Sequence, residues 1–195
     1  NLIMSSLGIL GCGWLGIPLG KHLQTLNYNI KGSCRSEEGT TNLNNNGIKG
    51  YRVILGENQT TGIKLFIEKL ETLIVSVPPG RKSKEGVYVR MIKTLLENIE
   101  STPLKRIIFL SSTSVYGSSE GVYNESSAVN PETPSAKALH SCEKLIINSS
   151  LPSIIVRLGG LIGEDRNPIF QLQGKTIGNP MAVSYTHLTL PTMRT

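Results

Sequence analysis

Three glycines with the spacing G-x-G-x-x-G constrain this chain more than any other feature. Gly11 to Gly16 reads GCGWLG and connects a short apolar run, Leu7 to Leu10, with a segment of helical periodicity, Trp14 to Leu26. In such a context the first glycine allows a tight turn, and the third lets the helix pack closely on the strand. We therefore expect a strand, a tight loop and a helix at the start of the fold.

The same alternation of strand and helix continues along the chain. Gly86 to Glu100 is the clearest helix, because its apolar residues fall on one stripe. Strands that alternate with helices at this spacing predict an α/β protein with a doubly wound parallel sheet, the Rossmann fold. The other expected strands are 29–34, 50–55, 72–77, 106–110 and 153–158, and the other expected helices are 38–46, 62–70 and 135–149.

Composition narrows the classes of partner. The 195 residues suffice for one domain with its own core, and no apolar run is long enough to cross a bilayer. The net charge is +6, but the basic residues are scattered, with the densest run at 81–84, so no nucleic-acid or membrane partner is expected. The first residues lack the layout of a secretion signal, and we expect a cytoplasmic protein.

The cysteines do not indicate a metal site or a disulfide. Cys12, Cys34 and Cys142 lie far apart in the sequence and form no ligand pattern with the three histidines. We therefore expect buried or idle thiols.

The glycine loop has the chemistry of a dinucleotide-binding site. Gly13 has no Cβ, so a pyrophosphate can approach the backbone, and the helix N-terminus offers N–H groups and a partial positive charge. The Pro78-Pro79-Gly80 turn follows the fourth expected strand, where the chain normally passes the adenine ribose. The predicted NAD(P)-binding residues of these two segments are Gly11, Cys12, Gly13, Trp14, Leu15, Gly16, Val77 and Pro78.

An arginine at the end of the second expected strand favours NADP over NAD. An NAD site usually has Asp or Glu there, about 20 residues beyond the glycines, to bind the ribose 2′-OH. This chain has Cys34 at that place, followed by Arg35 and Ser36, which suit a 2′-phosphate by charge and hydrogen bonding. NAD stays open because Glu37 and Glu38 are close by, and Arg35 as ordinary surface charge is the alternative interpretation.

A run of hydroxyl side chains follows the fifth expected strand. Ser111 to Gly117 reads SSTSVYG. Ligands of open α/β sheets bind beyond the carboxyl ends of the strands, so these hydroxyls are well placed. A serine-rich turn alone would be weak evidence, but the attached VYG and the upstream glycine loop make the pattern specific.

Four features together resemble the short-chain dehydrogenase/reductase superfamily, in its extended NAD-dependent epimerase/dehydratase branch. They are GCGWLG, SSTSVYG, an acid-proline turn over 124–133 and IIVRLGGLIG over 154–163, and the resemblance covers about Leu7 to Asn179. It implies a Rossmann domain with bound NAD(P), with Ser111 at the cofactor and Ser112 donating a hydrogen bond to the substrate oxygen. It also implies a small-molecule substrate, such as a sugar nucleotide or another carbonyl or alcohol compound, and a homodimer paired through helices like 86–100 and 135–149.

The tyrosine and lysine of the family's active site are missing. In the family the tyrosine moves the proton, and a lysine four residues later lowers the tyrosine pKa and holds the nicotinamide ribose. The acid that usually follows the lysine matches Glu143, which puts Leu139 at the lysine place and Ser135 at the tyrosine place. Leu139 continues an apolar stripe with Cys142, so we expect it to pack. Lys137 is two positions away and faces elsewhere on a helix.

Three accounts of this departure stay open. The preferred one is an NADP-dependent oxidoreductase or epimerase whose proton donor is Tyr116, Tyr123 or a residue of a further C-terminal region. The second is a cofactor-binding sensor or regulatory protein without chemistry. In the third, a small gap shifts the register and Lys137 still acts.

The expected domains follow from these motifs. Residues 4–163 are expected to form the NAD(P)-binding domain, and 164–181 the start of a C-terminal substrate-binding lobe that is largely missing. Residues 182–195 are expected to be a non-native tail, because VSYTHLTLPT over 183–192 looks like a translated sequencing adapter, and Met4 is the expected start.

Overall fold

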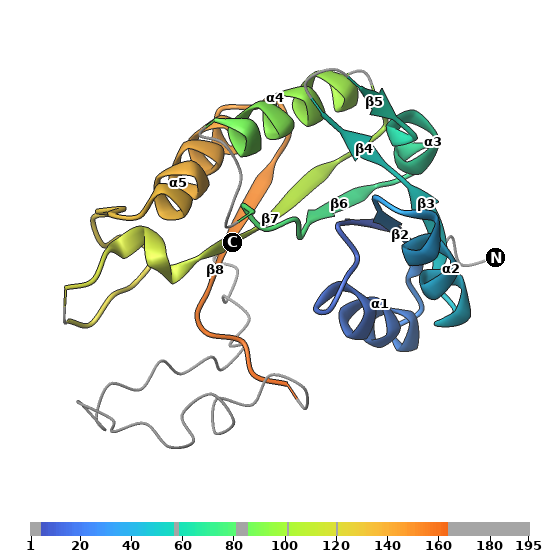
Figure 1. The fold of residues 1–195 in the computed structure, drawn as a ribbon, viewed down its shortest axis with the longest axis horizontal. Coiled ribbons are helices and arrows are strands. Elements are labelled where there is room, and N and C mark those ends of the chain that lie inside the picture. Colours follow the sequence, from blue (N-terminus) through green and yellow to red (C-terminus); the bar gives the residue numbers. More distant parts are fainter. Residues whose placement is uncertain (1–4, 57–58, 81–85, 101, 120, 164–195) are drawn as a thin grey trace.

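A parallel six-stranded sheet forms the middle of the molecule in the computed structural model, which describes residues 5–56, 59–80, 86–100, 102–119 and 121–163 (Figure 1). The basic run 81–84, the expected start of the C-terminal lobe over 164–181 and the expected tail over 182–195 lie outside the described residues. The strands are β1 (Ser6–Leu10), β2 (Asn29–Cys34), β3 (Lys49–Arg52), β6 (Thr72–Val75), β7 (Arg106–Ser112) and β8 (Ser153–Leu158). Their order across the sheet is β3-β2-β1-β6-β7-β8.

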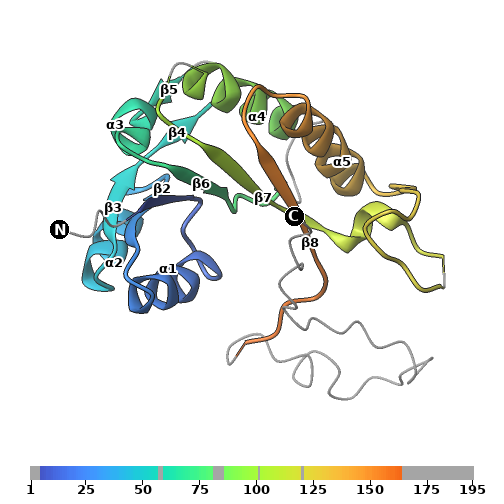
Figure 2. The same cartoon turned by 180° about the vertical axis from the view of Figure 1, so that it is seen from behind.

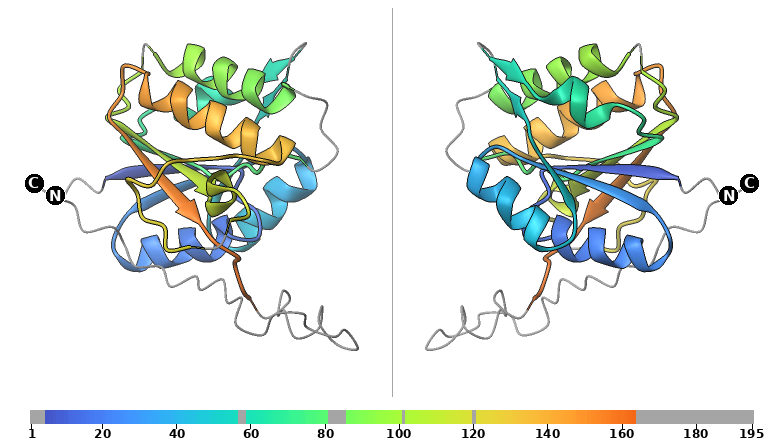
Figure 3. Two further views of the ribbon diagram at one scale, coloured as in Figure 1. Left: turned by 90° about the vertical axis from the view of Figure 1, so that its left-hand side faces the viewer. Right: turned by 90° about the vertical axis from the view of Figure 1, so that its right-hand side faces the viewer.

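Helices cover both faces of this sheet. One face carries α1 (Gly16–Thr25) and α2 (Glu37–Asn45), and the other carries α3 (Ile63–Ile67), α4 (Val87–Ile99) and α5 (Pro134–Ile147). Figure 2 shows the same arrangement from behind, and Figure 3 shows the two helical layers with the sheet between them. The prediction of a doubly wound Rossmann fold is confirmed, with the strand order typical of two mononucleotide-binding halves.

Alternate residues of the central strands point into two separate cores. In β6, Leu73 and Val75 join the cluster beneath α3, α4 and α5, whereas Ile74 joins the cluster beneath α1 and α2. Strands that are buried on both faces read as continuous apolar runs, which is why TLIV and RIIFL stand out in the sequence. Within the described ranges, no helix has the length and apolar character needed to span a bilayer.

One expected element differs from the structure. The predicted strand 50–55 is split, because β3 ends at Arg52 and the next residues form β4 (Ile54–Leu55), which pairs antiparallel with β5 (Thr60–Thr61). The N–H of Val53 still donates to the carbonyl of Cys34 at 2.8 Å. The apolar residues do not indicate this break in the sequence. Val53 is buried, and Leu55 packs against the same core although it lies outside the six-stranded sheet.

The carboxyl ends of β1, β2, β6 and β7 meet at one edge of the sheet. All four strands run parallel, with Leu10 of β1 paired to Val75 of β6 and Val75 paired to Phe109 of β7. The loops that follow these strands therefore lie near one another, and every site residue predicted from the sequence lies in these loops or in the strand and helix ends that adjoin them.

We expect Phe66→Ala to lower the free energy of unfolding by about 3–5 kcal/mol, because it would leave a cavity in the core. Phe66 on α3 is fully buried and packs edge-on against Tyr51. The matched control is Leu65→Ala, since the neighbouring Leu65 is 62% exposed; its effect should stay within about 0.5 kcal/mol. Urea denaturation measures both changes, and similar losses in the two variants would contradict this packing.

Candidate cofactor and active site

A buried serine holds the glycine loop against β2. The Ser33 hydroxyl accepts a hydrogen bond from the N–H of Gly11 at 3.2 Å, and the Ser33 carbonyl accepts one from the N–H of Cys12 at 2.7 Å. Gly11 has a φ of +80°, and a Cβ there would lie 2.6 Å from a methyl carbon of Val77. Only glycine suits this turn, where the loop after β1 touches the loop after β6.

The space in front of α1 is open. A Cβ added to Gly13 would meet no atom within 4 Å, whereas a Cβ on Gly16 would lie 3.1 Å from the Cys12 sulfur. Within the described part of the chain no side chain caps α1, whose N-cap residue is Leu15, and its first turn has no acid. An exposed glycine before a helix N-terminus that lacks a capping side chain is the arrangement that a pyrophosphate needs.

Cys12 and Trp14 have different surroundings within this loop. Cys12 is buried, and burial, with a smaller effect from Cys34, raises the pKa of its thiol to about 12. The thiol is therefore neutral, as expected for a small filler residue, and all three cysteines are free thiols. Trp14 lies against Gly163, where an added Cβ would come 2.5 Å from the indole ring. The loop thus touches the segment that follows β8.

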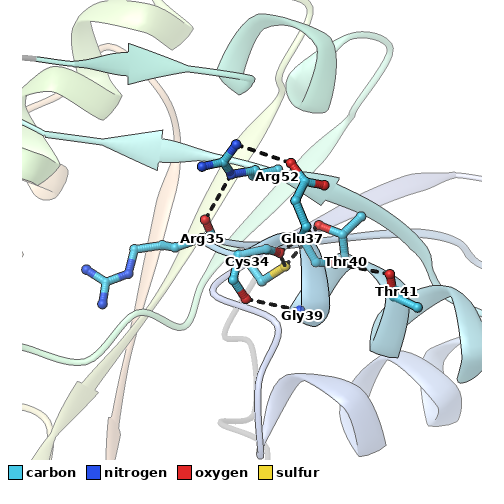
Figure 4. A network of polar contacts seen from close by, with 8 residues as sticks. Cys34, Arg35, Glu37, Gly39, Thr40, Thr41 and Arg52 are labelled. Carbon is cyan, nitrogen blue, oxygen red and sulfur yellow. Dashed lines mark hydrogen bonds and ion pairs between the residues drawn. The ribbon is translucent and has the colours of Figure 1, made fainter.

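The end of β2 forms the polar network of Figure 4. The Ser36 hydroxyl accepts a hydrogen bond from the N–H of Gly39 at 3.1 Å, and so caps α2. Arg52 of β3 donates from Nε to the carbonyl of Arg35 at 3.2 Å and from Nη1 to Glu37 at 3.1 Å. The exposed guanidinium of Arg35 points away from this pair in Figure 4. Ser36 therefore has a structural role that the cofactor prediction did not consider.

The loop after β6 is anchored by α4. The hydroxyl of Tyr88 donates to the carbonyl of Val77 at 2.6 Å, and Pro78 beside it is exposed. Because the Val77 side chain also abuts Gly11, these two predicted cofactor residues border the glycine loop.

The two serines at the end of β7 make different contacts. Ser111 is 5% exposed, and its hydroxyl donates to the carboxylate of Glu143 at 2.6 Å. The hydroxyl of the half-buried Ser112 accepts from the N–H of Ser114 at 3.1 Å, and so caps the 3₁₀ turn η1 (Thr113–Tyr116). Ser112 thus lies at the strand end, as the sequence predicts, whereas the Ser111 hydroxyl is directed to α5.

Glu143 of α5 is the centre of a buried network. Its side chain is 1% exposed and receives two hydrogen bonds from Arg157 of β8, at 3.1 and 2.8 Å. Burial alone would raise the pKa of Glu143, but the hydrogen bonds from Arg157 and Ser111 outweigh it and hold the pKa below its ordinary value. The same pairing raises the pKa of Arg157. Both groups are therefore charged, and Nδ1 of His140 lies 3.7 Å from the Glu143 carboxylate.

Arg157 extends this network to Tyr116. Its Nη1 donates to the Tyr116 hydroxyl at 2.9 Å, and that hydroxyl donates to the carbonyl of Asn124 at 2.8 Å. The ring of Tyr123 stacks on Tyr116 with 5.0 Å between centroids, and its hydroxyl donates to the carbonyl of Ser119. Of the two tyrosines considered as proton donors, only Tyr116 is seen to contact a positively charged group within the described residues.

The first turns of α5 match the expected departure. Ser135 is exposed in the first turn, close to the Thr133 hydroxyl, which caps the helix. Leu139 is 5% exposed and belongs to the core with Cys142, so the prediction that Leu139 packs is confirmed. Lys137 is exposed, away from this apolar face.

Sequence reasoning missed the partners of three polar residues, the buried Ser33 and Glu143 and the partly buried Arg157. A signal existed for two of them. Arg157 is the single charge in the strand SIIVRL, and Glu143 follows the buried Cys142 on the apolar side of α5. A charge inside an apolar run needs a partner, although the pattern does not name it. Ser33 carries no such signal, since serine is common in strands and loops alike.

Comparisons with known proteins show which proteins this chain is similar to. The model of the NAD dependent epimerase/dehydratase family matches residues 82–176. Protein YeeZ of Escherichia coli strain K12 is 31% identical over 179 residues, which cover 89% of this chain and 65% of that protein. The chain thus spans less than two thirds of the length of the curated relatives that it matches.

Two solved structures share the fold. UDP-glucuronic acid 4-epimerase from Bacillus cereus, in complex with NAD, has a TM-score of 0.70 and 20% identity, over 84% of this chain and 59% of that one. A short-chain dehydrogenase/reductase superfamily protein from Agrobacterium tumefaciens, with bound NAD, has a TM-score of 0.63 and 17% identity, over 78% of this chain and 48% of that one.

The sheet order and the glycine loop between β1 and α1 are those of a Rossmann fold, which the solved structure from Agrobacterium tumefaciens shares. The chain is similar to the NAD-dependent epimerase/dehydratase family over residues 82–176, and at the places expected for that family's tyrosine and lysine it has Ser135 and Leu139.

We expect Glu143→Gln to lower the free energy of unfolding at pH 7 by about 3–5 kcal/mol, because the charge of Arg157, whose side chain is only 21% exposed, would lose its partner. The folded-state pKa of Glu143 lies below the ordinary value of 4.5. Its stabilising effect is therefore complete above about pH 4.5 and is lost as the pH falls through the folded-state pKa.

The measurement is urea unfolding from pH 7 down to pH 3, with Glu97→Gln on the exposed side of α4 as the matched control. The difference between wild type and Glu143→Gln should shrink at the acidic end, while the control stays close to wild type throughout. A difference that does not change with pH would contradict an ionised Glu143.

Proposed function

We propose that this protein binds NADP(H) at the glycine loop and acts in the cytoplasm as an oxidoreductase or epimerase with an atypical active site. The observation that carries the proposal is the open space over Gly13 in front of the uncapped N-terminus of α1. The support from relatives is that solved structures of the same fold contain NAD. Residues 4–163 would supply the cofactor site, and a C-terminal region would supply most of the substrate site.

The preference for NADP rests on charge at the end of β2. No acid occupies the Cys34 position, and the exposed Arg35 follows it. The nearest acid of the described network, Glu37, is already paired with Arg52. An arginine binds a phosphate through several N–H groups, whereas the 2′-OH of NAD needs a carboxylate acceptor.

The substrate would be a small carbonyl or alcohol compound, with sugar nucleotides as the first class to test. The Bacillus cereus epimerase has been solved with UDP-glucuronic acid and NAD, which supports this choice. Pairing of two copies through α4 and α5 is also proposed, since these helices pack side by side on one face (Figure 1).

The bound cofactor would supply hydride transfer. Ser112, at the carboxyl end of β7, would donate a hydrogen bond to the reacting oxygen of the substrate, which requires its hydroxyl to keep only its acceptor side on the N–H of Ser114. The proposed proton donor is Tyr116. Its oxygen already accepts a hydrogen bond from Arg157, which supplies a positive charge beside the phenol, as the lysine does in the family.

A second function is favoured by the α5 helix. With Leu139 buried in the core and Ser135 exposed, the helix face that carries the family's proton transfer has become a packing face. A cofactor-binding sensor or regulatory protein would need the glycine loop and the buried network, but no proton donor.

Gly13→Val tests the cofactor site. We expect it to abolish dinucleotide binding, because the new side chain would fill the space that the pyrophosphate needs, while unfolding stays unchanged since nothing lies within 4 Å. Trp14, the single tryptophan, lies in the loop and reports binding through its fluorescence. The control is Gly121→Val in an exposed loop. Retained affinity in Gly13→Val would refute the site.

Turnover separates the enzyme from the sensor. Full-length protein with NADPH and a panel of carbonyl compounds and UDP-sugars should oxidise NADPH or convert a sugar. We expect Tyr116→Phe to lower kcat by about 100-fold or more, the scale of a lost general acid. Tyr123→Phe, on the neighbouring ring, should have little effect. Tight NADPH binding without turnover over the whole panel would support the sensor.

A further inference from the structure

Arg52 is a second arginine at the place where Arg35 is proposed to read the cofactor. It is the last residue of β3, and its Cα is paired with that of Cys34 at the end of β2. The N–H of Val53 donates to the carbonyl of Cys34 at 2.8 Å and keeps the two strand ends together. Tertiary structure thus places Arg52 against the backbone of Arg35, although 17 positions separate them in the sequence, while the exposed guanidinium of Arg35 points to the other side (Figure 4).

The guanidinium of Arg52 is held in place by two contacts. Nε donates to the carbonyl of Arg35 at 3.2 Å, and Nη1 donates to the carboxylate of Glu37 at 3.1 Å (Figure 4). The first contact orients the planar group at the strand end. It uses one of five N–H donors, and Glu37 accepts from one more, so three N–H donors of the guanidinium are left for a phosphate.

Glu37 is a weak partner for this arginine. Its side chain is 77% exposed and that of Arg52 is 49% exposed, so water and salt screen their attraction. A phosphate carries more negative charge than a carboxylate and accepts more hydrogen bonds. A 2′-phosphate at the end of β2 would therefore compete well for Arg52.

We propose that Arg52 is a second specificity residue for the ribose 2′-phosphate, and that Glu37 occupies its guanidinium when no cofactor is bound. The inference rests on the proposed NADP function and adds a residue and a competitor to it. When the phosphate binds, Arg52 exchanges the Glu37 carboxylate for phosphate oxygens and keeps its contact with the carbonyl of Arg35. Glu37 then opposes NADP by charge repulsion.

The test compares NADPH, NADH and 2′,5′-ADP binding to the purified protein, with Trp14 fluorescence as the readout. We expect Arg52→Ala to weaken NADPH and 2′,5′-ADP by about 10-fold, the scale of one charge-assisted hydrogen bond, and NADH by less than about 2-fold. Lys49→Ala, at the other end of β3, removes the same charge and should leave all three affinities unchanged. Arg35→Ala gives the reference loss for the first arginine.

Glu37→Gln is expected to change the affinity for NADPH in the opposite direction. Removing the competing carboxylate should strengthen NADPH and 2′,5′-ADP by about 3-fold or more and leave NADH within about 2-fold. Equal losses of NADPH and NADH in Arg52→Ala, or an unchanged NADPH affinity in both variants, would overturn the inference.

Failure of the underlying proposal gives a different result. Wild-type protein that binds none of the three ligands, or that prefers NADH, would refute the NADP function before any variant is compared. Wild-type preference for NADPH that depends on Arg35 and not on Arg52 would refute the second arginine alone.

Discussion

The carboxylate of Glu143 is buried where α5, β7 and β8 meet. It fixes the position of β7 and β8 relative to α5 near the carboxyl ends of the strands. Removing a charge from water costs several kcal/mol, so it stays buried only when hydrogen bonds replace the lost hydration. Arg157 supplies two of them and Ser111 supplies the third. If α5 moved away from β7 and β8, the charges of Glu143 and Arg157 would lose their partners. Because this loss is costly, the end of β7 is held in one position relative to α5.

The glycine loop after β1 is also held by hydrogen bonds to a buried polar residue, but this residue carries no charge. Ser33, buried in β2, accepts hydrogen bonds from the first two residues of the glycine loop. The contact between Gly11 and Val77 then brings the loop after β6 beside it. Buried polar groups with satisfied partners fix the loops that a ligand would touch, while the apolar cores beneath them supply most of the stability.

The first half of α5 packs where the sequence predicts a departure from the family that it resembles. With Glu143 as the reference for the register, Leu139 stands at the expected lysine place and adds apolar surface to the core. Ser112 at the end of β7 and Tyr116 in η1 are held by hydrogen bonds that do not involve α5 residues at the expected tyrosine and lysine places.

Much of the fold could be predicted from periodicity, because strands buried on both faces and amphipathic helices leave strong patterns. The break between β3 and β4 could not be predicted. Val53, which separates the two strands, and Leu55 in β4 are both apolar, so they read as a continuous strand. The hydroxyl of Ser36 illustrates a different limit. Its position before two acids is a helix-cap signal as well as a phosphate-site signal, and only the contact with Gly39 decides that it caps α2.

The sequence by itself determined the order of strands and helices, the glycine loop with its family resemblance, and the absence of the tyrosine and lysine. These are local properties, and each can be read from neighbouring residues. Tertiary structure decided the partners: Ser33 with Gly11, Arg52 with Glu37, and Glu143 with Arg157 and Ser111. These pairs lie between 14 and 32 residues apart. They meet because a parallel sheet gathers the ends of distant strands at one edge, which no local pattern records.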